Sequence, residues 1–138
     1  METALPVERT LTQTDHARLM RLLARGGQAP LPAAEAMRDM LDTSDVVPSP
    51  AVPSTVITMY TQVLLEEQDG TQHQLTLCYP PDANPSRGQV SVLSPIGAAV
   101  LGLRVGETAR WQPPTGDERS ARILSILFQP EAAGDYLR

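Results

Sequence analysis

Few side chains in this sequence have the type and spacing that catalysis or metal binding requires. The two histidines, His16 and His73, fall in different predicted modules, one at the first turn of a helix and one in a strand. We expect both at the surface, where lone polar side chains usually lie. Cys78, the one cysteine, is expected to be a small buried hydrophobic residue. No His or Cys pair has zinc spacing, and no glycine-rich loop has phosphate-binding spacing. We therefore predict a non-enzymatic protein without metal or cofactor.

Two carboxylates have a spacing that brings them together. Glu35 and Asp39 are four residues apart in a predicted helix, so they share a face. The simpler interpretation is a solvated face with one acid favourably near the helix N-terminus. The alternative is that Glu35 approaches a metal or a basic surface of a partner.

A second stretch combines a helix signal with residues suited to a contact surface. It is Ser94, Pro95, Ile96 and Gly97, and it follows the apolar run 90–93. Serine is a favoured N-cap, and proline suits the first helical position. A structural role as helix cap and core anchor is enough to account for these residues. A contact role is compatible with it, because a rigid capped turn can also present Pro95 to a partner.

Composition narrows the possible partners. The chain has 138 residues, enough for one domain or one with a small appendage, and a net charge of −5. That charge repels a nucleic-acid backbone, so we expect no direct nucleic-acid binding and instead a basic protein or a large complex as partner. No leader and no apolar run near 20 residues is present, and no small-molecule site is indicated. A soluble cytoplasmic protein that does not bind membranes is the expectation.

The first 47 residues predict a short antiparallel helical hairpin. Thr12 or Thr14 can start the first helix, and the tip contains Gly26, Gly27 and Gln28. Residues 1–13 are expected to fray or to lie over the surface. The apolar stripes of the two helices either dimerise or fold back on the rest of the chain. The stretch 46–53 contains three prolines, so it is predicted to form neither a helix nor a paired strand. Residues 48–53 are the predicted extended linker between the hairpin and the next domain.

Alternating patterns from residue 54 onwards predict a sheet domain over residues 54–138. Five strands are expected, with a tight turn at 68–71 and one short helix after Ser94. The expected strands cover 56–66, 74–79, 90–93, 107–112 and 121–127. The fold class is therefore α+β, with a mainly antiparallel sheet that curls around its helix.

Three segments carry a family resemblance. The run Val-Leu-Ser-Pro-Ile-Gly followed by Leu-Gly-Leu-Arg-Val-Gly resembles the carboxy-terminal domain of bacterial Gre transcript elongation factors. The closing residues 128–137 and the strand residues 56–59 resemble the branch of this family known as regulators of nucleoside diphosphate kinase (Rnk). The resemblance spans about residues 52–138 and implies a domain similar to FK506-binding proteins (FKBP-like).

The resemblance implies RNA polymerase as partner, bound near its secondary channel. The matching loop of Gre factors is implicated in docking, so Ser94, Pro95, Ile96 and Gly97 are the expected polymerase-binding residues. Gre factors carry two carboxylates at the coiled-coil tip that help to hold magnesium, whereas residues 26–31 here contain no acid. Transcript cleavage is therefore not expected, and the Rnk branch implies an effect on nucleoside diphosphate kinase levels.

Two rival functions follow from the same resemblance. A prolyl isomerase or chaperone is suggested by the fold alone, which does not determine function. Its pocket requires several aromatics, and Trp111, Tyr60, Tyr79 and Phe128 are few and scattered. A cleavage-competent Gre factor is the other rival, and it would have to use Glu35.

Overall fold

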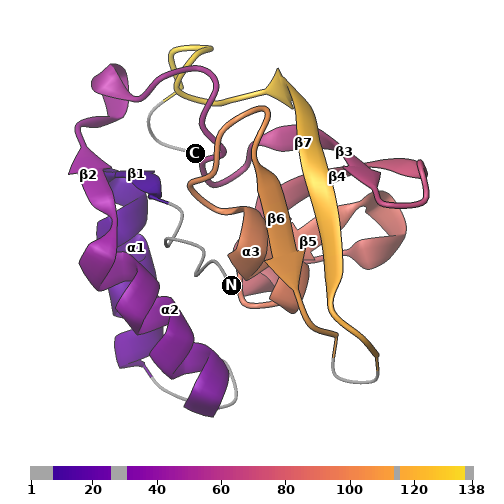
Figure 1. The fold of residues 1–138 in the computed structure, drawn as a ribbon. Helices are drawn as coiled ribbons and strands as arrows, with labels where there is room; N and C mark the ends of the chain where they lie inside the picture. Colours follow the sequence, from indigo (N-terminus) through magenta and orange to yellow (C-terminus); the bar gives the residue numbers. More distant parts are fainter. Residues whose placement is uncertain (1–7, 26–30, 114–115, 136–138) are drawn as a thin grey trace, which may run out of the picture.

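The computed structural model describes residues 8–25, 31–113 and 116–135, and it shows a helical hairpin beside a curled sheet (Figure 1). The hairpin consists of α1 (Gln13–Ala24) and α2 (Leu31–Thr43). The sheet contains β3 (Gln62–Glu67), β4 (Gln72–Cys78), β5 (Gln89–Ser91), β6 (Thr108–Trp111) and β7 (Arg119–Phe128). The remaining elements are β1 (Thr10–Thr12), β2 (Asp45–Val47), α3 (Pro95–Val100) and three single 3-10 turns, η1 (Ser49–Ala51), η2 (Pro80–Asp82) and η3 (Pro85–Arg87).

The start of α1 and the apolar faces of the hairpin confirm the sequence pattern. The side chain of Thr12 accepts a hydrogen bond from the amide of Asp15 at 3.0 Å and so caps the helix. Leu19 of α1 and Met37 and Leu41 of α2 are buried in the same core as the sheet residues. The apolar stripes of the hairpin therefore fold back on the sheet, one of the two outcomes that the sequence left open.

A short parallel ladder closes the base of the hairpin, contrary to what the sequence predicts. β1 pairs with β2, and Thr10 lies opposite Asp45. Residues 10–12 had been expected to fray or to lie over the surface, but they are buried. Residues 46–53 had been expected to hold neither a paired strand nor a helix. The ladder is possible because β2 ends before Pro48, and η1 is possible because proline is compatible with the first turn of a helix.

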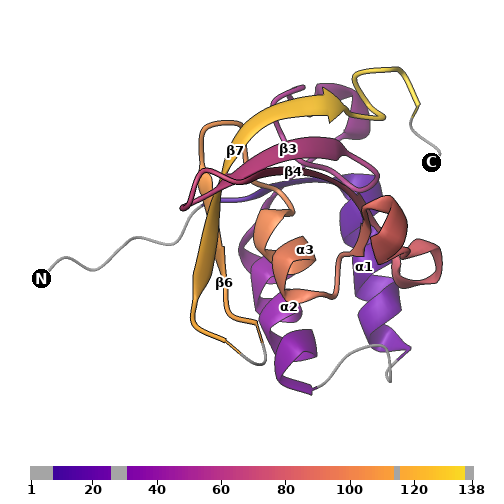
Figure 2. The ribbon, with the colours of Figure 1, turned by 90° about the vertical axis from the view of Figure 1, so that its right-hand side faces the viewer.

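The five-stranded sheet has the order β5-β4-β3-β7-β6 and is mixed. Three of its neighbour pairs are antiparallel, whereas β5 runs parallel to β4. Figure 2 shows β7, β3 and β4 curving over α3. The predicted α+β class and the curled sheet around a single helix are confirmed.

The first sheet strand begins six residues later than predicted, at Gln62 instead of Val56. In the preceding segment the amide of Thr58 donates to Oγ1 of Thr61 at 2.9 Å, and Tyr60 has a left-handed φ of 65°. Threonine side chains that bond to nearby backbone compete with a strand ladder. The alternating pattern therefore continues through a segment that is not a strand.

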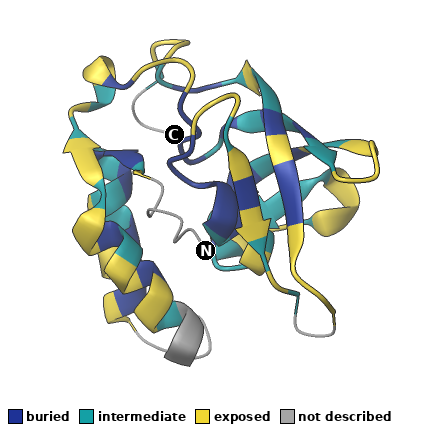
Figure 3. Ribbon diagram, in the orientation of Figure 1, coloured by how far each residue is buried: buried dark blue, intermediate teal, exposed yellow. Residues whose placement is uncertain are grey.

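The core lies between the sheet, α3 and the hairpin. Its fully buried side chains include Leu65 and Ile123 of the sheet and Leu101 after α3. Figure 3 shows buried residues along α3, among them Gly97, Ala99 and Val100, while the outer face of α2 is exposed. The candidate site lies between the hairpin and α3, because residues of both α2 and α3 line the same cavity.

Candidate partner-docking site

The turn that opens α3 is held by a compact set of hydrogen bonds. The hydroxyl of Ser94 accepts from the amide of Gly97 at 3.1 Å and donates to the carbonyl of Ser91 at 2.7 Å. Pro95 occupies the first turn, where its missing N–H leaves no bond unmade. The predicted Ser-Pro helix start is confirmed, and the turn is rigid.

Gly97 is required by the close approach of the chain to itself. A Cβ atom at this position would lie 2.0 Å from the carbonyl oxygen of Ser91. Gly97 is buried, Ser94 and Ile96 are half-buried, and Pro95 is exposed. Of the four predicted docking residues, Pro95 is therefore the one most accessible to a partner, and Gly97 shapes the turn from inside.

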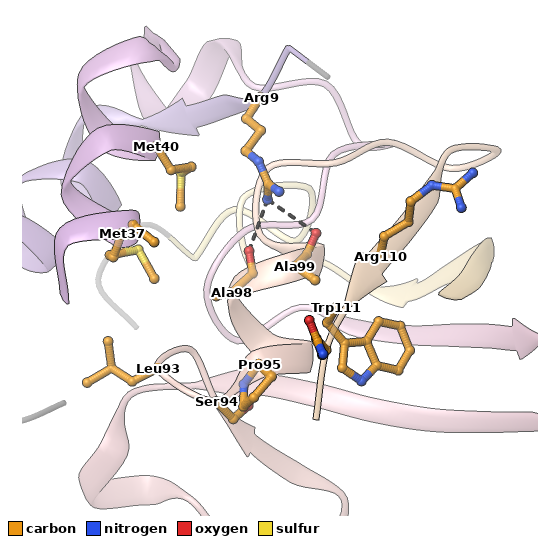
Figure 4. A pocket seen from close by; sticks show the side chains of 12 residues that line it. Arg9, Met37, Met40, Leu93, Ser94, Pro95, Ala98, Ala99, Arg110 and Trp111 are labelled. Carbon is orange, nitrogen blue, oxygen red and sulfur yellow. Dashed lines mark hydrogen bonds between the residues drawn. The ribbon is translucent and has the colours of Figure 1, made fainter. Parts of the chain in front are cut away.

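A cavity of about 540 Å³ opens beside this turn, between α2 and the α3–β6 side of the sheet (Figure 4). Most of its lining is apolar, and α2 contributes three of the lining residues while the α3–β6 side contributes eight. The lining residues are Arg9, Ala36, Met37, Met40, Leu93, Ser94, Pro95, Ala98, Ala99, Arg110, Trp111 and Gln112. Sequence reasoning found Ser94 and Pro95 but missed the α2 wall, because the wall exists only once the hairpin is docked.

Arg9 forms the upper edge of the cavity and fixes the end of α3. Its Nη1 donates to the carbonyls of Ala98, Ala99 and Leu101 at 3.0, 3.2 and 2.7 Å. These are carbonyls that the last turn of a helix leaves without intrahelical partners. Burial lowers the pKa of Arg9, and the charge of Glu107 opposes that shift. Arg9, from the segment expected to fray or to lie over the surface, therefore holds the end of α3 beside the cavity.

A buried carboxylate joins the hairpin to the segment before β3. Asp15 is 4% exposed, and its Oδ2 accepts from the amide of Met59 at 3.1 Å. Burial raises the pKa of Asp15 to about 6, and the nearby charge of Glu131 adds to the rise. Glu131 itself accepts from the hydroxyl of Thr58 at 2.7 Å. This polar junction fixes α1, and with it α2, relative to the sheet.

The predicted tip residues are not part of this site. Gly26, Gly27 and Gln28 lie outside the described residues. Glu35 and Asp39 are exposed on α2 and do not line the cavity, which takes Ala36, Met37 and Met40 from that helix. In the described part of the chain, no three His, Cys, Asp or Glu side chains gather as a metal site would require.

The two histidines contact neighbouring elements, and the cysteine is buried in the fold. Nε2 of His16 lies 3.1 Å from the carbonyl of Leu41, and Nε2 of His73 lies 3.3 Å from Glu67. Both histidines are half-buried, so the expectation of exposed side chains is wrong, because each one packs against a neighbouring element. Cys78 is 1% exposed, which confirms its prediction as a small buried residue.

The sheet domain that contains this turn matches a known protein family. Residues 52–128 match the family model described as "Transcription elongation factor, GreA/GreB, C-term", and the chain belongs to this family. The chain is 38% identical to the "Regulator of nucleoside diphosphate kinase" of Escherichia coli K12 over 92% of its own length and 94% of that protein.

Two further comparisons lie within the same family. The chain is 41% identical to the transcription elongation factor GreA of Solidesulfovibrio magneticus, over 53% of this chain and 45% of that protein. A solved structure of a prokaryotic GreA/GreB elongation factor from Nitrosomonas europaea superposes with a TM-score of 0.75 at 29% identity, covering 89% of this chain and all of that one. The hairpin is therefore shared with that structure as well as the sheet domain. In the described residues, no helix is long and apolar enough to cross a membrane.

Proposed function

We propose that this protein is a non-enzymatic transcription factor that binds RNA polymerase near the secondary channel. Membership of the Gre family supports this role. The observation that carries the proposal is the apolar cavity beside exposed Pro95, because a rigid turn next to an apolar pocket can hold a protruding partner segment. The contact surface comprises Ser94, Pro95, Ile96 and the cavity walls, and Gly97 keeps the turn in shape.

The partner segment is expected to insert an apolar side chain between the two halves of the molecule. Met37 and Met40 on the α2 wall have flexible thioether chains that adapt to an inserted group. Trp111 on the opposite wall adds a large, partly accessible ring. Exposed Arg110 at the rim favours a partner whose apolar group is flanked by an acid.

The hairpin is too short to act at a distance. α1 has 12 residues and α2 has 13, so the arm measures about 18–20 Å. Glu35 and Asp39 are exposed near the middle of α2, and no group of three His, Cys, Asp or Glu side chains that could hold a metal ion forms among the described residues. The protein therefore occupies the channel entrance without stimulating transcript cleavage, and it affects nucleoside diphosphate kinase levels through transcription.

Binding to purified core RNA polymerase tests this function. The labelled protein is titrated with polymerase, a Gre factor is added as competitor, and the same mixture is assayed for cleavage on backtracked complexes. Displacement by the competitor without cleavage is the expected result. Absence of binding would refute the proposal, and metal-dependent cleavage would refute its inactive tip.

Matched variants locate the contact on the surface. Pro95→Glu and Met40→Glu place a charge in the proposed contact and should weaken polymerase binding about tenfold or more, as changes at the centre of an interface do. Leu127→Glu is the control, because Leu127 is 46% exposed and does not line the cavity. Equal affinity of Pro95→Glu and the wild type would exclude the turn as the docking site.

A further inference from the structure

A second cavity lies on the other side of the hairpin and carries the opposite charge from the rest of the chain. It is lined by Arg18, Arg21, Leu22, Arg25, Tyr79 and Pro81, and its volume is about 290 Å³. The protein has a net charge of −5, yet among the residues that the structure describes no acid lines this cavity, and three of the eleven arginines do. The sequence contains no lysine, so every one of its basic side chains has the planar guanidinium group.

The three arginines form a row along α1. Their spacing of three and four residues places them on one face of the helix, over about 10 Å of its axis. Guanidinium groups bind both phosphates and carboxylates through paired, parallel hydrogen bonds, so a single small anion fully engages only one arginine of the row. The row therefore suits a ligand with two or more phosphate groups better than a single small anion.

The floor of the cavity is apolar and aromatic. Leu22 is buried and Tyr79 is half-buried, and the ring of Tyr79 packs edge-to-face against Tyr60 with centroids 5.8 Å apart. Tyr60 in turn donates from its hydroxyl to Oδ2 of Asp82 at 2.5 Å. Burial and the Asp82 carboxylate raise the pKa of Tyr60 to about 12.

Tyr60, whose ring packs against Tyr79, has an unfavourable backbone conformation. Tyr60 has a φ of 65°, a region that bulky residues avoid. Such conformations persist only where the surroundings enforce them, and they concentrate at functional sites. Here the Thr58–Thr61 turn contains the strained residue, and the Tyr60 ring packs against Tyr79, which lines the cavity.

We propose that this cavity binds a nucleotide that carries at least two phosphates. The phosphates bind Arg18, Arg21 and Arg25, and the base packs on Tyr79 and Pro81. The volume exceeds what an inorganic phosphate needs and lies near the lower end of small-molecule sites, roughly 300 Å³. The bound nucleotide would contact both α1 and the η2 loop, so it would join the hairpin to the sheet.

Displacement of a fluorescent GDP analogue from the full-length protein tests the proposal. Unlabelled GDP and ADP should displace the analogue, whereas guanosine and inorganic pyrophosphate should do so at least about tenfold less well, because each lacks half of the contacts. Displacement by pyrophosphate at the same concentration as GDP would overturn the nucleotide assignment. A short single-stranded RNA that competes at lower nucleotide concentration than GDP would instead indicate a polymeric ligand.

Arginine variants of equal net charge provide the control. Arg21→Gln and Arg25→Gln should each weaken binding of the GDP analogue about tenfold, whereas Arg87→Gln and Arg122→Gln, at exposed positions of the sheet domain, should leave it unchanged. An equal loss in all four variants would show non-specific charge attraction and overturn the proposal, as would no binding at millimolar concentration. Polymerase is absent from this experiment, so its result is independent of the docking function.

Discussion

The carboxylate of Asp15 in α1 accepts a hydrogen bond from the backbone amide of Met59, 44 residues further along the chain. The amide belongs to the irregular segment that precedes β3, where no strand partner takes it up. One side chain thus satisfies a buried backbone donor and fixes the direction in which the hairpin leaves the sheet.

The first prediction concerns pH. Because burial raises the pKa of Asp15 from 3.8 to about 6, the folded protein holds this proton more tightly than the unfolded chain does. Stability that is present below pH 4 is therefore lost as the pH rises through about 6, by roughly 3 kcal/mol. Asp15→Asn cannot ionise and keeps an oxygen acceptor for Met59. Its free energy of unfolding, measured by urea denaturation, should equal that of the wild type near pH 4 and exceed it at pH 7.

The control for this effect is Asp39→Asn, since Asp39 is exposed. Its stability should follow the wild type across the whole pH range. Parallel curves for the wild type and Asp15→Asn would show that the buried carboxylate does not govern the pH dependence.

The second prediction tests the source of the shift. The negative charge of Glu131 contributes to the raised pKa of Asp15, after the larger effect of burial. Glu131→Gln keeps an acceptor for Thr58 and removes the charge. The pKa of Asp15, followed by carboxyl NMR, should move down from about 6 towards its ordinary value. An unchanged titration would mean that the two carboxyl groups do not interact.

The third prediction concerns the capped turn. Gly97→Ala would place a methyl group against the backbone oxygen of Ser91, which cannot move without disturbing the cap. We expect a loss of about 2 kcal/mol or more in the free energy of unfolding, the upper range for an overpacked core. Gly116→Ala, at a position with open space, should change it little. Equal denaturation midpoints for the two variants would refute the close approach.

The fourth prediction concerns Arg9. Arg9→Met keeps much of the aliphatic packing but leaves the carbonyls of Ala98, Ala99 and Leu101 without this donor. The loss should be roughly 1–3 kcal/mol, as for other hydrogen bonds to charged groups. Arg110→Met, which lines the same cavity from an exposed position, serves as the comparison and should be nearly neutral.

Local signals in the sequence predicted the parts of the fold that depend on neighbours in the chain. Thr12 and Ser94 cap helices because the bonded amides lie three residues away, and the α2 stripe of Met37 and Leu41 follows from helical spacing. The same kind of signal located the capped helix start at Ser94 and Pro95, whereas the docking role proposed for this turn came from the family resemblance.

Other features depend on residues far apart in sequence. The β1–β2 ladder joins residues 35 apart, and nothing in Thr10–Thr12 indicates its partner. The contacts of Arg9 reach about ninety residues along the chain, and the cavity requires α2 and β6 to face one another. Alternation in 56–61 was misleading because the threonine hydroxyls there bind backbone and prevent a ladder.

The β1–β2 ladder closes the arm at its root, with Thr10 level with Asp45 and Thr12 level with Val47. An arm anchored at both roots can be lengthened only by matched insertions in its two helices. An insertion in one helix alone would slide its apolar stripe past that of the other and bow the arm instead of extending it. The length of the arm is therefore set by both helices together. A longer arm of this architecture requires two coordinated insertions, one in each helix.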